Sequence, residues 1–345
     1  MRIEKRRLGS LEKCYAVSLF RDGGRDHLLA ASEKVNQCRV YGMDGTLESV
    51  VWDEPGGTMS LVPARDREGQ FLASQRFYSP DDSKEAIIVS AVHEEDGWRV
   101  RTLAELPHAH RFDILEGRDK TRYLIACTVK SASEYDGDWR FPGKVYAAEF
   151  PADGAKEGEN LDFAVLKEDM YRNHGYCRHR GRDGEEALVC SDEGVFLFIP
   201  PAKRGGEWTV RQIADMPVSD AVLWDLDGDG EEELLILAPF HGDTLAVCKW
   251  RDGKYEKVYE HPEKLGFLHA ICPGYIGGTP CVYVGHREEK RDLGAVVADR
   301  ETGYRLLVID RDCGPANCVY YREDGVDKLL AANRETDEIA VYEFY

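Results

Sequence analysis

The sequence predicts an all-β protein, a seven-bladed β-propeller closed by its N-terminal strand. Signals for helices are nearly absent, because apolar residues alternate or form short runs that Gly, Asp and Asn interrupt every 8–12 residues. The second observation is a unit that recurs seven times. Each copy has a short apolar strand, an Asp/Gly turn and a second apolar strand that ends in small residues.

The repeated unit gives the predicted fold its seven blades. The copies start about 45–65 residues apart, and a third strand and often a fourth follow each one. Four strands per unit at this period are typical of a β-propeller. We therefore expect a single domain over residues 1–345. In chain order, the copies read "CYAVSLFRDGGRDHLLAAS" from Cys14, "MSLVPARDREGQFLASQ" from Met59, "HRFDILEGRDKTRYLIACT" from His110, "HGYCRHRGRDGEEALVCSD" from His174, "DAVLWDLDGDGEEELLILA" from Asp220, "HAICPGYIGGTPCVYVGH" from His269 and "NCVYYREDGVDKLLAANR" from Asn317.

The last unit lacks a fourth strand within its own part of the chain. It ends at Tyr345 after its third strand, "IAVYEFY". The N-terminal stretch "RIEKRRL" precedes the first unit. We expect it to complete the seventh blade, which closes the ring and leaves no free sheet edge.

Composition restricts the partners of the chain. The net charge of −19 disfavours nucleic acid and anionic membranes, and no apolar run reaches the roughly 20 residues that cross a bilayer. A neutral or cation-assisted ligand fits better, and we expect a small-molecule sugar substrate. The start of the chain lacks the apolar segment of a secretory signal, and the ten cysteines have no paired spacing. We therefore expect reduced thiols and a cytoplasmic protein, and leave open a partner subunit or a homo-oligomer.

An acidic turn in the fifth unit has the spacing of a calcium-binding loop. In "AVLWDLDGDGEEELLIL" three carboxylates stand two residues apart, and Ca²⁺ prefers such hard oxygen ligands. The alternative is a tight hairpin without an ion. We expect a structural rather than catalytic role for this turn. The possible calcium ligands are Asp225, Asp227, Asp229, Glu231 and Glu233.

Propeller geometry places the chemistry at the other end of the strands. The first strand of each blade lines the central channel, so residues that open these strands surround one mouth. Four consecutive units open with His110, His174, Asp220 and His269. Three imidazoles and a carboxylate suit a divalent metal such as Zn, Mn, Ni or Mg. The alternative is a polar plug of the channel without a metal.

Loops after the second strands reach the same mouth and carry aromatic and cationic side chains. Such side chains suit a sugar or hydroxy-acid ligand, because the aromatic rings offer apolar faces and the cations hold oxygens. A long insert in the third unit, "KSASEYDGDWRFPGK", has the length of a lid. The predicted substrate-binding residues are Arg76, Lys130, Tyr135, Trp139, Arg287 and Arg334.

The chain resembles FG-GAP and VCBS-type propellers through "DLDGDG". With "HAH", "NHG" and "LHA" at strand starts, it is also similar to the propeller of the aldos-2-ulose dehydratases, lyases of keto-sugars such as 1,5-anhydrofructose. This resemblance implies a metal-assisted β-elimination, in which a base outside the metal shell removes a proton beside a ketone. The leaving group would be water or, in a keto-glycoside, an alcohol. The candidate bases are His108, His241, His286 and Tyr78.

Two other functions remain open at this point. No nucleophile elbow, P-loop, dinucleotide-binding or zinc-protease motif is present in the sequence. A non-catalytic propeller that binds a glycan or a protein would use the histidines as channel filler. A lyase for uronate polysaccharides would need more cations at the mouth than the sequence offers.

Overall fold

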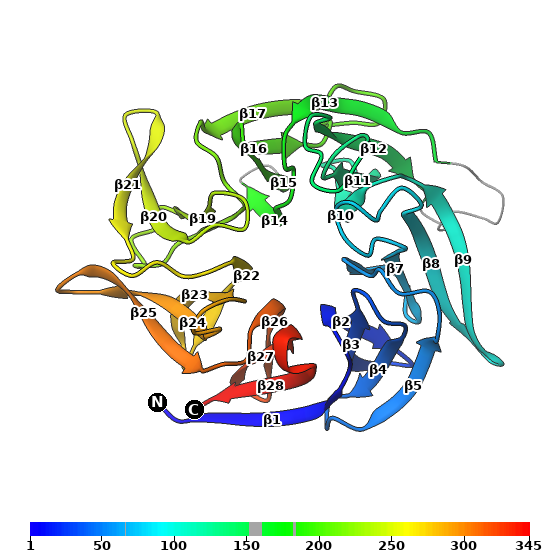
Figure 1. The fold of residues 1–345 in the computed structure, drawn as a ribbon, viewed down its shortest axis with the longest axis horizontal. Coiled ribbons are helices and arrows are strands. Elements are labelled where there is room, and N and C mark those ends of the chain that lie inside the picture. Colours follow the sequence, from blue (N-terminus) through cyan, green and yellow to red (C-terminus); the bar gives the residue numbers. More distant parts are fainter. Residues whose placement is uncertain (66, 152–160, 182–183) are drawn as a thin grey trace.

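Seven four-stranded antiparallel sheets form a ring in the computed structural model, which describes residues 1–65, 67–151, 161–181 and 184–345. Figure 1 looks down the ring, with the innermost strands around the centre and the long outer strands at the rim. The predicted seven-bladed β-propeller is confirmed. Blades 1 to 4 consist of β2 (Cys14–Asp22), β3 (Arg25–Ser32), β4 (Cys38–Gly42) and β5 (Leu47–Trp52); β6 (Leu61–Pro63), β7 (Gln70–Gln75), β8 (Ile87–Glu94) and β9 (Gly97–Glu105); β10 (Ala109–Glu116), β11 (Arg122–Thr128), β12 (Gly143–Phe150) and β13 (Ala164–Met170); and β14 (Tyr176–Gly181), β15 (Gly184–Ser191), β16 (Gly194–Ile199) and β17 (Thr209–Ala214).

The remaining three blades complete the ring. Among the described residues, the single helical segment is a short 3-10 turn, η1 (Arg334–Thr336), and no helix is long and apolar enough to span a bilayer. Blades 5 to 7 consist of β18 (Asp220–Trp224), β19 (Glu233–Ala238), β20 (Thr244–Arg251) and β21 (Lys254–Glu260); β22 (Leu268–Ile276), β23 (Thr279–His286), β24 (Leu293–Asp299) and β25 (Gly303–Asp310); and β26 (Pro315–Glu323), β27 (Val326–Asn333), β28 (Glu338–Phe344) and β1 (Ile3–Ser10).

The N-terminal strand closes the ring, as predicted. β1 pairs with β28 in antiparallel register from Ile3↔Phe344 to Ser10↔Glu338. Two further backbone hydrogen bonds of 2.9 Å join Arg2 and Tyr345, so the two termini lie side by side in Figure 1. The first and last parts of the chain thus share one blade, and the outer edge of β28 is covered.

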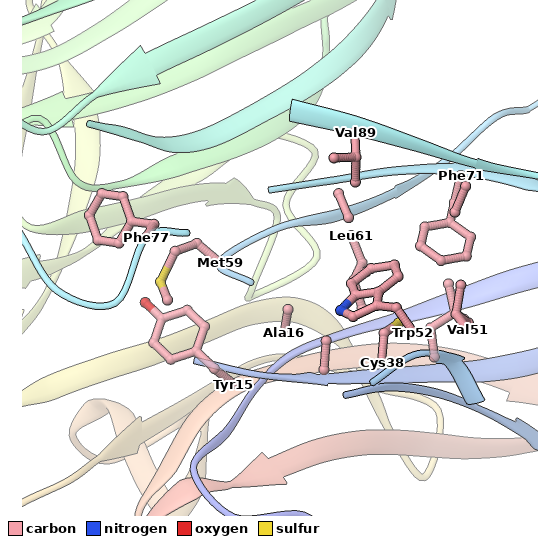
Figure 2. Packing of buried hydrophobic residues seen from close by; sticks show 14 of the residues in the cluster. Tyr15, Ala16, Cys38, Val51, Trp52, Met59, Leu61, Phe71, Phe77 and Val89 are labelled. Carbon is pink, nitrogen blue, oxygen red and sulfur yellow. The ribbon is translucent and has the colours of Figure 1, made fainter. Parts of the chain in front are cut away.

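The core is divided among the seven contacts between neighbouring blades. In β3, Leu28 and Ala30 pack towards the seventh blade, whereas Leu29 and Ala31 pack towards the second. Because successive strand residues point to opposite faces of a sheet, both faces of such a strand are buried. This explains why the second strand of each unit reads as a continuous apolar run. Figure 2 shows one such contact, where Trp52 and Phe71 of neighbouring blades have ring centroids 6.1 Å apart.

Candidate functional site

β-Bulges near the start of four inner strands bring three side chains together at the channel axis. A register shift follows the first paired residue of four inner strands, so that one residue is left out of the pairing with the next strand. These strands are β2, β10, β22 and β26. The skipped residues are Tyr15, His110, His269 and Ala316. A bulge leaves its extra residue outside the ladder and turns its side chain away from the regular alternation. Tyr15, His110 and His269 therefore meet, although they belong to three different blades.

The bulged residues form one hydrogen-bonded group with His174. The Tyr15 hydroxyl lies 3.2 Å from Nε2 of His110 and 3.1 Å from Nε2 of His269. The His174 ring, from the segment just before β14, has its centroid 4.5 Å from that of His110 and 5.1 Å from that of His269. All four side chains are buried. We call them, together with His241, the histidine layer.

The second nitrogen of each axial histidine has a fixed partner. Nδ1 of His110 lies 3.2 Å from the His174 carbonyl, and Nδ1 of His269 lies 2.6 Å from the Ala316 carbonyl. Nδ1 of His174 lies 2.8 Å from a carboxylate oxygen of Asp220. Carbonyl and carboxylate oxygens only accept, so each Nδ1 carries a proton and each Nε2 of the neutral ring presents a lone pair. Metal-binding histidines are oriented by partners of this kind.

His241 completes the layer from the loop after β19. Its Nε2 lies 3.3 Å from Nε2 of His174, and its ring is stacked between Phe240 and Phe267, with centroids 3.9 and 4.2 Å away. One ring nitrogen each of His174, His241 and His269 lies within 4.8 Å of the others. Two nitrogens on one zinc ion at ~2.1 Å can be at most ~4.2 Å apart. A small movement of the rings would thus let these three bind one ion.

The surroundings disfavour the charged form of His110, His241 and His269. Burial, and then the neighbouring His174, hold the pKa of His110 and His269 well below the usual range. The same causes lower the pKa of His241 to about 2. Burial also raises the pKa of Tyr15 to about 12, so its hydroxyl keeps its proton. Neutral imidazoles are the form that binds a metal.

The proton count in the layer leaves a lone pair without a donor. Tyr15 has one hydroxyl proton and faces two Nε2 acceptors, on His110 and His269. A buried acceptor without a donor costs free energy. A cation among these nitrogens would satisfy it, so the donor set fits a divalent first-row metal.

Asp220, one of the four predicted metal ligands, has a different position from the histidines. The Asp220 carboxylate accepts hydrogen bonds from Nδ1 of His174 and the Ser219 hydroxyl, so it orients a histidine instead of joining the ring nitrogens. Tyr15 was missed because Cys14 opens the first copy in the sequence. A position counted back from the end of the inner strand could have identified Tyr15. In three blades the bulged residue stands seven positions before the last residue of its strand: Tyr15 before Asp22, His269 before Ile276 and Ala316 before Glu323.

Two of the predicted bases, His108 and His286, are buried and hydrogen-bonded outside the histidine layer. His286 is buried, and its ring nitrogens contact the Glu288 carbonyl at 3.0 Å and the Asp292 N–H at 3.2 Å. His108 is buried against the Ser83 hydroxyl, 2.8 Å from its Nδ1, and burial lowers its pKa to about 4. Neither side chain has a ring nitrogen in the hydrogen bonds of the histidine layer. Tyr78 is half-buried, and burial raises its pKa.

The predicted ligand-binding cations at the mouth are mostly neutralised. Lys130 was predicted to hold substrate, but its side chain is 0% exposed and its Nζ bonds Asp81 at 2.7 Å. Arg287 pairs with Glu335 at 2.8 Å, and Arg334 pairs with both Glu33 and Glu335. These three side chains serve to fasten loops to one another.

The other predicted mouth residues differ in exposure. Arg76 and Tyr135 are exposed, with Tyr135 at 58%, and both are free of the core. Trp139 packs instead against the ammonium of Lys130, 4.2 Å from its ring centroid, and edge-on against Phe240 at 5.2 Å. The insert thus contacts the aromatic stack around His241 through the Trp139 indole ring.

The acidic turn lies at the opposite end of β18 and contains an internal cation. Nζ of Lys249 lies 2.6 Å from Asp227, 2.8 Å from Asp229 and 3.0 Å from Glu233. Asp225 accepts hydrogen bonds from backbone N–H groups of the turn. The ammonium offsets one of the negative charges of the carboxylates that were predicted to bind calcium, and that calcium site stays a prediction.

A cavity of about 360 Å³ continues along the channel from the histidine layer towards the hairpin end of the strands. Asp220 and His269 line it at the layer, and residues on or beside the inner strands of blades 1, 2, 3, 4, 6 and 7 line the rest. Arg111 and the ion pair of Arg178 with Asp113 are among them. Its size lies within the usual range for small-ligand pockets.

The fold and the site together define a class: a seven-bladed β-propeller with a buried histidine layer on its axis. No family model and no curated protein matches the sequence. Solved propellers match the fold at 11–12% identity, which shows the fold alone. They include virginiamycin B lyase from Staphylococcus aureus (TM-score 0.59, all of both chains), the Cps50 (Swd1) propeller domain of Myceliophteria thermophila (TM-score 0.62, 99% of both) and the soluble aldose sugar dehydrogenase of Escherichia coli (TM-score 0.51, 99% of both).

Proposed function

We propose that the protein is a metal-dependent carbon–oxygen lyase that acts on a keto-sugar at the propeller axis. The observation that carries this proposal is the convergence of the Nε2 lone pairs of His110, His174 and His269 in a buried layer, with one hydroxyl proton between two of them. His174, His241 and His269 would hold the ion. A bound divalent ion would supply Lewis acidity to a ketone oxygen and so acidify the neighbouring C–H.

Residues of the chain supply the remaining functions. Asp220 fixes the tautomer of His174, and Phe240 and Phe267 fix the plane of the His241 ring. His110 is the layer imidazole outside the three ligands, and its Nε2 faces the Tyr15 hydroxyl. A proton from a ligand at the metal would therefore reach His110 through the Tyr15 hydroxyl, which donates its own proton to Nε2 of His110 as it accepts one. The enzymes among the structural neighbours support catalysis by this fold, without indicating this reaction.

The test is a substrate screen with the metal-loaded protein. Elimination beside a ketone gives a conjugated enone, so absorbance near ~230–280 nm should grow with 1,5-anhydrofructose or a 3-keto-glucoside. It should disappear after chelation and in a His269→Gln variant, and persist in His93→Gln, which removes a surface histidine paired with Asp22. If a metal-loaded protein turns over neither class but binds a glycan or protein, the binding-module function replaces this one. Turnover of uronide oligosaccharides alone would favour the uronate lyase.

A further inference from the structure

Arg111 lines the channel cavity without an acidic partner. Its guanidinium donates one hydrogen bond to the Met59 carbonyl at 2.8 Å and one to Oδ1 of Asn317 at 3.1 Å. Guanidinium has five N–H donors, so three remain. Within residues 1–65, 67–151, 161–181 and 184–345, no carboxylate pairs with it. A half-buried, permanently charged group normally has a counter-ion.

Four other cationic side chains near the cavity and the mouth each have a carboxylate as counter-ion. Arg178, which lines the same cavity, pairs with Asp113. Lys130, Arg287 and Arg334 near the mouth each pair with a carboxylate. Arg111 differs from all four, and it is held in place by two hydrogen bonds to neutral acceptors and by the Tyr15 ring, whose centroid is 5.6 Å away. A fixed cation with free donors in a cavity is an anion-binding group.

The position of Arg111 connects this anion site to the histidine layer. Its guanidinium lies over the Tyr15 ring, and the Tyr15 hydroxyl lies 3.1 Å from Nε2 of His269. His269 itself lines the cavity beside Asp220. A ligand whose anionic group is bound by Arg111 would therefore place its other end near the layer, on the hairpin side of it.

We propose that the channel cavity binds a sugar-sized monocarboxylate, such as a uronate, with its carboxylate on Arg111. The guanidinium fork matches the two oxygens of a carboxylate. One unpaired positive charge matches one negative charge, whereas a dianionic phosphate would leave a charge uncompensated near Asp113 and Asp220. The inference rests on the proposed function for the fate of the ligand, but not for its binding, which needs no metal.

Binding is tested on metal-free, full-length protein by calorimetry with sodium D-glucuronate and with its neutral analogue D-glucuronamide. Glucuronate should bind, and glucuronamide should bind at least tenfold more weakly. Arg111→Gln should weaken glucuronate binding by about 10–100-fold. Arg322→Gln, an exposed arginine near the end of β26, should leave it unchanged. Equal binding of the two sugars, or full binding by folded Arg111→Gln, would overturn the inference.

The comparison of the two sugars on the wild-type protein remains decisive if Arg111→Gln does not fold. The two proposals also fail separately. Tight metal binding without glucuronate binding would overturn the carboxylate site alone. Arg111-dependent glucuronate binding by a protein that takes up no metal would overturn the proposed lyase and leave the carboxylate site standing.

Discussion

Nδ1 of His174 donates a hydrogen bond of 2.8 Å to the carboxylate of Asp220, across the boundary between the fourth and fifth blades. This contact ties the orientation of one histidine to the neighbouring blade. Because the carboxylate can only accept, the lone pair of His174 is fixed on Nε2, which faces His241 at 3.3 Å. Asp220, at the start of the inner strand of the fifth blade, therefore fixes the tautomer of His174 that a metal requires.

Asp220→Asn tests this positioning role. An amide can donate as well as accept, so the tautomer of His174 is no longer fixed. Loss of such a partner weakens metal binding by about 10–100-fold. Titration of the metal-free protein with metal measures this change in affinity. The control is Asp22→Asn, which changes a similar contact at the surface, where Asp22 lies 2.6 Å from Nδ1 of His93. Equal metal affinity of Asp220→Asn and wild type would contradict the role of Asp220.

Tyr15→Phe tests the proton count in the layer. Without the hydroxyl, the single donor that Nε2 of His110 and Nε2 of His269 share is lost, so one more buried acceptor is unsatisfied, which costs about 1–3 kcal/mol. The metal-free variant should unfold at lower denaturant by that amount, and added metal should restore part of the loss. Tyr321→Phe is the matched control, because its buried hydroxyl has no partner in the described structure. A Tyr15→Phe protein as stable as Tyr321→Phe would show that the hydroxyl is dispensable.

Asp229→Asn tests the internal cation of the acidic turn. The hydrogen bond from Lys249 lowers the pKa of Asp229 below its usual value of 3.8. A lowered folded-state pKa stabilises the protein above the unfolded value, and this stabilisation disappears as the pH falls through the folded value. The variant should melt about 1–2 °C below wild type at pH 7, and the difference should shrink as the pH falls below 3.8. A gap that stays constant down to pH 3 would assign the effect to something other than this carboxylate's charge.

Removal of residues 1–10 tests the closure of the ring. The truncation exposes the edge of β28 along the register from Ile3↔Phe344 to Ser10↔Glu338. An open edge pairs with other chains, so we expect a lower melting temperature and association on size-exclusion chromatography. A synthetic peptide of residues 1–10 should reverse both. A truncated protein that stays monomeric and equally stable would mean that β1 contributes little to the closed ring.

The sequence predicts the ring and three of its axial histidines because both follow from local repetition. The repeated unit fixes which strand is innermost, and the opening position then places His110, His174 and His269 at one end of the channel. The bulge at Tyr15 was not predictable in this way, because a bulge is a shift in pairing between two strands rather than a property of one.

Charge pairing explains the remaining differences. Lys249 reaches Asp227 and Asp229 from a strand about twenty residues later, and Lys130 reaches Asp81 from another blade. Such contacts depend on how blades meet, which a repeat pattern does not state. The same holds for Arg111, whose lack of an acidic partner becomes visible only once every neighbour is placed.

The metal content of the histidine layer tests the central claim most directly. Tag-free protein, dialysed against zinc, manganese, nickel or magnesium and then against buffer, should keep about one ion per chain by plasma mass spectrometry. His269→Gln should lose it, and His93→Gln, at the surface, should keep it. A wild-type protein that retains no ion of the four, or a folded His269→Gln protein that retains as much as wild type, would contradict a metal held by the histidine layer.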